Sequence, residues 1–208
     1  MILQREFYLR NANLVAPDLL GKLLVHRSQE GITSGFIVEV EAYMGYNDKG
    51  AHTYLNKRTP RTEIQFGLGG YAYIYLIYGM YSCFNVVANE RDKPEAVLVR
   101  ALEPFEGINL MQKRRNKNDL IELCNGPGKL CTALNITREN YGADLCGDNL
   151  YIEDRPKIPN EKISVSPRIN IDYAEECKDY FWRYYINDNC YVSKVPQRYK
   201  NNSKAFKI

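Results

Sequence analysis

The stretch "YAYIYLIYGMY" (71–81) contains five tyrosines in eleven residues, spaced first two and then three positions apart. In its first half, tyrosines alternate with aliphatic residues, which is typical of a β-strand with one aromatic and one aliphatic face. The alternation ends after Leu76, and Gly79 supplies a turn residue that tolerates positive φ. We therefore expect a strand over 71–77, followed by a hairpin tip that carries Tyr78, Met80 and Tyr81. Taken alone, the segment is equally consistent with a tyrosine-rich strand packed beside a core.

The length of 208 residues is that of one domain with a sizeable core. We expect this domain to span residues 1–195, followed by a basic tail at 196–208 that is a candidate for disorder. The chain start does not resemble a secretion signal, and no apolar run approaches membrane-spanning length. These features predict a cytoplasmic or nuclear protein, with no membrane partner, that acts as a monomer.

The cysteine and histidine content argues against a metal site. None of the six cysteines forms a CxxC pair, and the two histidines, His26 and His52, have no metal-ligand spacing beside them. The sequence therefore predicts reduced thiols, no metal and no cofactor.

Charge is distributed unevenly, although the formal net charge is only +3. Basic residues gather at 56–61, at 112–117 and in the tail, whereas acidic residues gather at 139–154 and 172–179. Such runs usually form solvated surface, but basic segments also bind along a phosphate backbone, where each neutralised charge releases a counterion.

The remaining pattern predicts an α+β fold. A strand hairpin is expected around Glu30-Gly31, and further strands are expected at 71–77, 83–88, 96–102, 149–154, 163–169 and 180–186. Helices are expected at 14–21, 59–67, 106–115 and 126–134, the second with Thr59 as its cap and Pro60 in its first turn. The class is therefore a single compact domain around a curved, mostly antiparallel β-sheet, open and barrel-like, with flanking helices. The long loop 44–57, which contains His52, has the length of a functional loop.

Alternation in "GFIVEVEAYMG" (35–45) places Glu39, Glu41 and Tyr43 on one strand face together with Ile37. Residues two apart on a face lie roughly 7 Å apart, so Glu41 and Tyr43 can serve one bound group. Outward-facing glutamates are most often just solvated. A buried carboxylate beside an aromatic wall is instead a candidate general base.

Two cations lie in unusual surroundings. Arg100 interrupts the apolar strand "VLVRALEP" (97–104), and it requires an acidic partner such as Glu39 or Glu41, in a structural ion pair or an active site. Lys129 follows the glycine-flanked helix start of "CNGPGKLC" (124–131), which suits an anion but fits neither a Walker loop nor a dinucleotide fingerprint.

Seven motifs together resemble the 3-methyladenine (alkyladenine) DNA glycosylase family. In order they are "IVEVEAYMG" (37–45), "AH" (51–52), "TPR" (59–61), "YIYLIYGMYSCFNV" (73–86), "VLVRALEP" (97–104), "GPGKLC" (126–131) and "SPRIN" (166–170). They cover nearly the whole chain, and their order and spacing make the match specific. The resemblance implies a partner, double-stranded DNA with damaged purines, and the excision of alkylated or deaminated purines by hydrolysis, which leaves an abasic site.

The resemblance also implies roles for the tyrosines, because glycosylases rotate the target nucleotide out of the duplex. Tyr78 would fill the vacated space. Tyr43 on one side, with His52 and Tyr75 on the other, would sandwich the extruded base. An aromatic cage favours a cationic alkylated base by about 1 to 2 kcal/mol where desolvated.

The remaining implied roles concern chemistry and selectivity. Glu41 would activate the attacking water, oriented by Arg100 and the backbone carbonyl of Ile169. Asn85 would crowd the purine 2-position and exclude the amino group of guanine. Four further residues would touch the DNA backbone or groove: Met80, Tyr81, Thr59 and Lys129.

Two departures from the family pattern and two other functions remain open. "FGLGGYAY" (66–73) replaces a more proline-rich stretch, and Asn170 stands where glycine is common. A non-catalytic nucleic-acid binding module would use tyrosines as stacking platforms, but it leaves Glu39, Glu41 and Arg100 unexplained. An enzyme acting on bases in RNA or in nucleosides is the second alternative.

Overall fold

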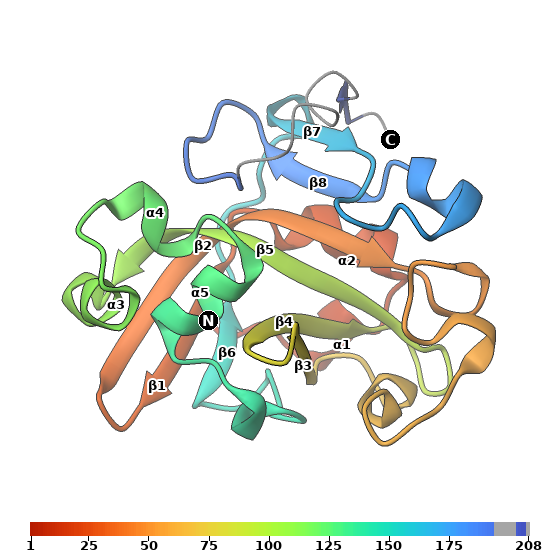
Figure 1. Ribbon diagram of the computed structural model, residues 1–208, viewed down its shortest axis with the longest axis horizontal. Coiled ribbons are helices and arrows are strands. Elements are labelled where there is room, and N and C mark those ends of the chain that lie inside the picture. The colour runs from red at the N-terminus through yellow and green to blue at the C-terminus, as the bar shows by residue number, and fades with distance from the viewer. Residues whose placement is uncertain (194–202, 207–208) are drawn as a thin grey trace.

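The computed structural model describes residues 1–193 and 203–206, and its architecture is organised by the long strand β2 (Gly31–Tyr43) (Figure 1). One edge of β2 pairs with β5 (Glu95–Glu106) along most of its length. Its other edge is shared, because β1 (Leu23–Ser28) pairs with residues 31–36 and β8 (Arg183–Ile186) pairs with residues 39–41. The sheet therefore forks along β2.

All the strand pairs of the described residues are antiparallel. The main branch runs β3-β4-β5-β2-β8-β7-β9, and β1 and β6 form the second branch. The other strands are β3 (Ala72–Ile77), β4 (Tyr81–Ala88), β6 (Leu150–Glu153), β7 (Ile163–Ser166) and β9 (Lys204–Ala205). This confirms the predicted α+β class with a large, mostly antiparallel open sheet.

Short helices flank the sheet (Figure 1). The α-helices are α1 (Arg5–Tyr8), α2 (Ala12–Leu19), α3 (Ile108–Arg115), α4 (Leu120–Cys124) and α5 (Pro127–Leu134). The 3₁₀ turns are η1 (Gly45–Asn47), η2 (Tyr54–Asn56), η3 (Glu63–Phe66), η4 (Arg138–Asn140), η5 (Asn160–Lys162) and η6 (Glu175–Asp179).

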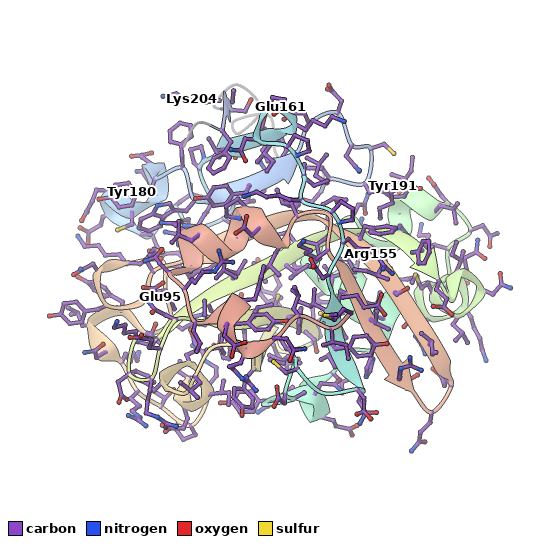
Figure 2. The ribbon with its side chains drawn as sticks, turned by 180° about the vertical axis from the view of Figure 1, so that it is seen from behind. Glu95, Arg155, Glu161, Tyr180, Tyr191 and Lys204 are labelled. Atoms are coloured by element: carbon purple, nitrogen blue, oxygen red, sulfur yellow. The ribbon has the colours of Figure 1, made fainter. Side chains whose placement is uncertain are left out.

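The start of α2 is fixed by side chains from two directions. Asn11 caps the helix by accepting a hydrogen bond from the Asn13 amide at 2.9 Å. Glu95 of β5, labelled in Figure 2, accepts a hydrogen bond from the Ala12 amide at 2.6 Å. A carboxylate there complements the positive end of the helix dipole. Buried apolar residues of α2, the sheet and α5 form one core cluster.

The predicted helix at 59–67 is wrong. The segment forms turns followed by the short η3, which begins after Thr62, so Thr59 caps no α-helix. Locally, the Thr59 amide donates to Thr62 Oγ1 at 2.9 Å, and the Thr62 amide donates to the Thr59 carbonyl at 2.9 Å. Threonine hydroxyls that bind nearby backbone groups in this way compete with helix formation.

An irregularity in the β2–β5 ladder changes which side chains face the core. Val38 and Arg100 have no partner in the ladder, and the register shifts on either side of them. On β2 the core-facing residues are Ile37, Val40 and Ala42, so the alternation is interrupted between Ile37 and Val40. On β5 the same interruption separates Val99 from Leu102. Ile37 therefore lies in the core and not, as simple alternation predicts, on the face of Glu41.

The end of the chain is described only in part. Lys204 and Ala205 form β9 on β7, and Figure 2 shows Lys204 at the same end of the molecule as Glu161. The rest of the predicted tail at 196–208, except residues 203 and 206, lies outside the described residues. Within 1–193 and 203–206, no helix is long and apolar enough to cross a membrane. The same residues contain no group of three or more His, Cys, Asp or Glu side chains that could hold a metal ion.

Candidate active site

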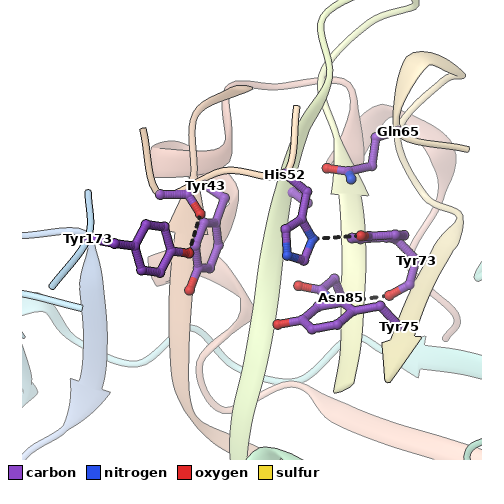
Figure 3. Close-up of a pocket in the computed structure, with 9 residues that line it drawn as sticks. Tyr43, His52, Gln65, Tyr73, Tyr75, Asn85 and Tyr173 are labelled. Carbon is purple, nitrogen blue, oxygen red and sulfur yellow. Dashed lines mark hydrogen bonds between the residues drawn. The ribbon is translucent and has the colours of Figure 1, made fainter. Parts of the chain in front are cut away.

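An aromatic cleft opens on the face of the sheet that the irregularity turns away from the core. Its volume of about 510 Å³ lies within the range typical of small-molecule sites. Tyr43, His52, Tyr75 and Tyr173 line both this cleft and a narrow pocket that adjoins it and reaches Asn85. Figure 3 shows Tyr43 on one side of the pocket, with His52 and Tyr75 facing it on the other.

Glu41 lies beside the cleft with no exposed surface and is held at both carboxylate oxygens. Oε1 accepts a hydrogen bond from the Ile169 amide at 2.8 Å and lies 3.3 Å from a terminal nitrogen of Arg100. Oε2 accepts a hydrogen bond from the Tyr43 hydroxyl at 2.9 Å. Three groups therefore fix the orientation of this carboxylate.

Arg100 joins Glu41 to a second buried carboxylate, Glu39. The Nε of Arg100 donates to Glu39 Oε1 at 3.0 Å. Burial disfavours the charged guanidinium, but the charges of Glu41 and Glu39 outweigh it and raise the pKa of Arg100. The sequence argument that Arg100 needs acidic partners is therefore confirmed, and both candidates are its partners.

Glu39 also has a second cation beside it. It accepts hydrogen bonds from Arg183 Nε at 2.7 Å and from the amide and hydroxyl of Ser193 at 2.7 Å and 2.9 Å. Burial alone raises the pKa of Glu39, but Arg100, Arg183 and the Ser193 hydrogen bond hold it below its ordinary value. Two carboxylates and two guanidiniums thus balance in charge, as buried ions require.

His52 is held in its neutral form within the aromatic wall. Its Nδ1 lies 2.7 Å from the Tyr73 hydroxyl, and its ring contacts Tyr75 edge-on at 4.7 Å between centroids. Burial, with the nearby positive charges of Arg61 and Lys57, lowers the pKa of His52 to about 4. Burial also raises the pKa values of the Tyr43 and Tyr75 phenols well above the usual value. At neutral pH the cage therefore consists of uncharged rings.

A buried ion pair ties the loop that carries His52 to the segment that carries Ile169. The Arg168 side chain has no exposed surface, and its two terminal nitrogens donate to Asp48 at 2.5 Å and 2.7 Å. Asp48 in turn accepts hydrogen bonds from two amides of its own loop, those of Met44 and Gly50. The Arg168 guanidinium also lies over the Tyr43 ring at 4.6 Å. Loop 44–57 is therefore held by buried side chains.

Ile169 and Asn170 lie at the cleft, on the segment that follows Pro167. Both residues line the cleft, and the Ile169 group that contacts Glu41 is its amide. The role expected of the Ile169 carbonyl stays a prediction. Asn170 has φ of 60°, in the left-handed region that glycine and asparagine tolerate best. This geometry explains how asparagine can stand where glycine is common.

The hairpin between β3 and β4 projects at the mouth of the cleft. Tyr78 is 82% exposed and has φ of 53°, and Met80 and Tyr81 beside it are 68% and 50% exposed. A non-glycine residue with positive φ is a strained feature that clusters at functional sites. The predicted hairpin tip is confirmed. Tyr78 also lines the cleft, so the tip adjoins the site.

Comparison with known proteins assigns the chain to a family. The sequence profile of the methylpurine-DNA glycosylase (MPG) family matches residues 6–190. A protein of Clostridium acetobutylicum is 55% identical over 201 residues, which cover 93% of this chain and 98% of that protein. This chain belongs to the methylpurine-DNA glycosylase family. A protein of Clostridium novyi is 52% identical over 200 residues, covering 92% of this chain and 98% of the relative. Both relatives carry the name "Putative 3-methyladenine DNA glycosylase".

Membership of the methylpurine-DNA glycosylase family makes the protein a DNA glycosylase, an enzyme of DNA repair that hydrolyses N-glycosyl bonds. It confirms the family resemblance noted in the motifs, and it makes DNA the substrate. The residues that the motifs single out for catalysis and base binding gather in one place, since Glu41, Tyr43, His52, Tyr75, Arg100 and Ile169 line the cleft or contact one another.

Four predicted DNA-contact residues of this DNA glycosylase do not line the cleft: Met80, Tyr81, Thr59 and Lys129. Thr59 lines a neighbouring groove, and Lys129 donates to the Asn125 side chain at 2.7 Å. Their predicted contacts with DNA stay predictions. Gly128, beside Lys129, packs so closely on Tyr81 that an added Cβ would lie 3.1 Å from the Tyr81 Cβ.

Sequence reasoning missed several residues that build the site. Tyr173 lines the cleft and donates to the Gly50 carbonyl at 3.4 Å, and Gln65 lines the narrow pocket. The Asp48–Arg168 pair and Arg183 were also missed. The arginine within "SPRIN" was the available signal, because an arginine in a predicted strand requires an acidic partner wherever that strand is buried.

Proposed function

We propose that this DNA glycosylase extrudes alkylated or deaminated purines, of the 3-methyladenine, 7-methylguanine and hypoxanthine type, from double-stranded DNA. It then hydrolyses the N-glycosyl bond and leaves an abasic site. The observation that carries the proposal is the position of Glu41, which is fully buried at the edge of a cleft lined by uncharged aromatic rings. Its carboxylate is held by the Ile169 amide, the Tyr43 hydroxyl and Arg100. The names of the two relatives support the choice of 3-methyladenine.

In the proposed mechanism, Glu41 accepts a proton from the water that attacks the anomeric carbon of the sugar. The attack comes from the face opposite the leaving base, through a transition state with oxocarbenium character. Such a base must be ionised and correctly aimed. The hydrogen bonds from the Ile169 amide and the Tyr43 hydroxyl, together with the nearby guanidinium of Arg100, hold the Glu41 carboxylate in one orientation.

Recognition of the base depends on the aromatic walls. An alkylated purine that carries positive charge is attracted to the faces of Tyr43 and Tyr75 by cation–π interaction, about 1 to 2 kcal/mol where desolvated. The neutral state of His52 avoids repulsion of that cation. The uncharged cage therefore supports discrimination in favour of cationic lesions over normal bases.

Tyr78 is proposed to enter the duplex at the position that the extruded nucleotide leaves. Its exposure of 82%, its place at a hairpin tip and its contact with the cleft support this role. Extrusion costs a few kcal/mol of unstacking, which a ring inserted into the stack offsets in part.

The decisive experiment incubates the purified protein with methylated duplex DNA and measures free bases in the supernatant by chromatography. Release of 3-methyladenine with retention of intact, alkali-labile strands is the expected result. Strand cleavage without alkali, or release only from RNA or free nucleosides, would contradict the proposed reaction.

A further inference from the structure

A second groove lies beside the aromatic cleft, and the proposed reaction gives it no role. Its volume is about 500 Å³, and three residues, Arg61, Tyr75 and Leu76, line both the groove and the cleft. The two depressions are therefore contiguous across β3. The groove is completed by Thr59, Pro60, Ile74, Arg138 and Tyr141.

The floor of the groove is the outer edge of the sheet. Among the described residues, β3 is the terminal strand of the main branch, and β4 is its only strand partner. The Ala72 amide and carbonyl bond to residues 142–143 and not to β4. By the alternation of an antiparallel ladder, the peptide groups of Ile74 and Leu76 point the same way, toward the groove. An edge of this kind offers backbone N–H donors to a ligand.

Two guanidinium groups flank this edge. Arg61 and Arg138 are both exposed, and neither has an acidic partner among the described residues. Arg58, three residues before Arg61, instead pairs with Glu63. Glu139 follows Arg138 along η4 but does not line the groove. The groove therefore presents two guanidinium cations that no described carboxylate neutralises.

We propose that this groove binds the phosphodiester backbone of the DNA strand next to the extruded nucleotide. The proposal rests on the proposed function, because that function places the extruded nucleotide in the adjoining cleft. The DNA strand whose nucleotide enters the cleft carries a phosphate on each side of the extruded sugar. Because the groove is contiguous with the cleft, the DNA backbone on one side of that sugar can continue into the groove. Guanidinium and backbone N–H groups are the donors that bind phosphate oxygens in protein–DNA complexes.

The competing occupant is an acidic peptide that adds a strand to the β3 edge. Charge favours DNA, because the same Arg61 faces both depressions and one continuous polyanion can occupy both. A peptide in the groove would instead compete with the DNA for Arg61.

The test measures binding of an undamaged fluorescent duplex by anisotropy at several salt concentrations, since phosphate contacts do not depend on sequence. Arg138→Ala is expected to weaken binding about two- to fivefold at low salt. It is also expected to reduce the slope of log K against log salt by about 0.9, the value for one phosphate contact. Arg138→Lys, which keeps the charge, is expected to restore most of the slope.

Lys162→Ala is the matched control, because it removes one exposed positive charge on η5, which lines neither depression. An Arg138→Ala slope equal to that of the wild type and of Lys162→Ala would overturn the proposal. Absence of release by the wild type would refute the proposed function but not the groove, which is tested on undamaged DNA.

Discussion

The Tyr43 hydroxyl donates a hydrogen bond to Glu41 Oε2 at 2.9 Å, so one residue lines the aromatic cleft and also holds the proposed catalytic carboxylate. The Tyr43 ring forms a wall of the cleft, and its hydroxyl helps to fix the orientation of the Glu41 carboxylate. Because the two side chains stand on one face of β2, the strand itself sets their spacing. In the proposed mechanism, base recognition and water activation are therefore coupled through one strand.

Glu41→Gln is expected to abolish base release, with a loss of at least about 100-fold in the single-turnover rate. The amide keeps the shape of the carboxylate but cannot accept the proton of the attacking water. Binding to a lesion duplex is expected to persist, because the aromatic walls and the hairpin tip are unchanged. Gel-shift titration measures the binding, and chromatography of released bases measures the rate.

Tyr43→Phe is the natural companion variant, because it removes only the hydrogen bond to Glu41 and keeps the ring. A small loss in rate with unchanged binding is expected. If Glu41→Gln released bases at the wild-type rate, Glu41 would be a structural ion-pair residue and another group would activate the water.

Tyr78→Ser is expected to reduce retention of the extruded state, because serine cannot fill the space left in the base stack. The fluorescence of 2-aminopurine placed next to a lesion reports unstacking directly. Leu55→Ser is a useful control, since Leu55 is also an exposed apolar residue with positive φ but does not line the cleft. Equal fluorescence in the wild type and Tyr78→Ser would show that Tyr78 does not enter the duplex.

Arg168→Met is expected to destabilise the protein by about 3 to 5 kcal/mol, because it leaves the Asp48 carboxylate buried without its partner. Arg58→Met breaks the exposed pair with Glu63 and is expected to cost far less, because water screens that pair. Urea unfolding followed by circular dichroism compares the two. Similar losses from both variants would show that the buried pair does not hold loop 44–57.

His52 predicts an acid-dependent loss of stability. Its pKa is about 4 in the folded protein against the ordinary 6.5, so protons bind the unfolded chain more tightly. Its contribution is constant above pH 6.5, is lost progressively from 6.5 to about 4, and is then constant again. At pH 5 the loss is about 2 kcal/mol. In His52→Gln, the change in unfolding free energy between pH 7.5 and 5 is expected to be smaller than in the wild type by this amount. An identical change in both proteins would contradict the assignment.

Much of the fold follows from local pattern, and the exceptions have identifiable physical causes. The tyrosine alternation and Gly79 predict the β3–β4 hairpin, since side-chain period and turn chemistry are local properties. The helix predicted at 59–67 fails because the hydroxyls of Thr59 and Thr62 bind nearby backbone groups. The predicted orientation of Ile37 is wrong because of the irregularity in the β2–β5 ladder. Such an irregularity depends on the partner strand, which the pattern of a single strand does not reveal.

The sequence predicted several of the residues that line the candidate site, but not the residues that hold them in place. Arg100 lies in an apolar strand and therefore requires an acidic partner, and the sequence pointed to Glu39 and Glu41 as the candidates. Arg183 and Ser193 reach Glu39 from more than 140 positions away, and Tyr173 meets Gly50 from 123 positions away. Such contacts depend on how the sheet forks along β2, and no local pattern encodes that fork.

Asn85→Ala is expected to raise release of guanine-derived bases relative to hypoxanthine or alkyladenine. Asn85 is 3% exposed, and its amide nitrogen donates to the carbonyls of Tyr73 at 3.0 Å and Cys83 at 3.3 Å. The side chain is therefore fixed where it lines the narrow pocket. Guanine carries an amino group at the purine 2-position, where adenine and hypoxanthine carry only hydrogen. A fixed side chain turns that difference into a steric conflict.

The assay for Asn85 compares single-turnover rates on duplexes that differ only in the target base. Asn85→Ala also removes two buried hydrogen bonds, so Asn85→Ser serves as a second, more polar variant that opens the same space. In both variants the ratio of the guanine-type to the adenine-type rate is expected to rise, without a matching gain on alkyladenine. Circular dichroism and residual activity on alkyladenine establish that each variant is folded. An unchanged ratio in a folded, active variant would place the selectivity elsewhere in the pocket, with Gln65 and Tyr173 as the next residues to replace.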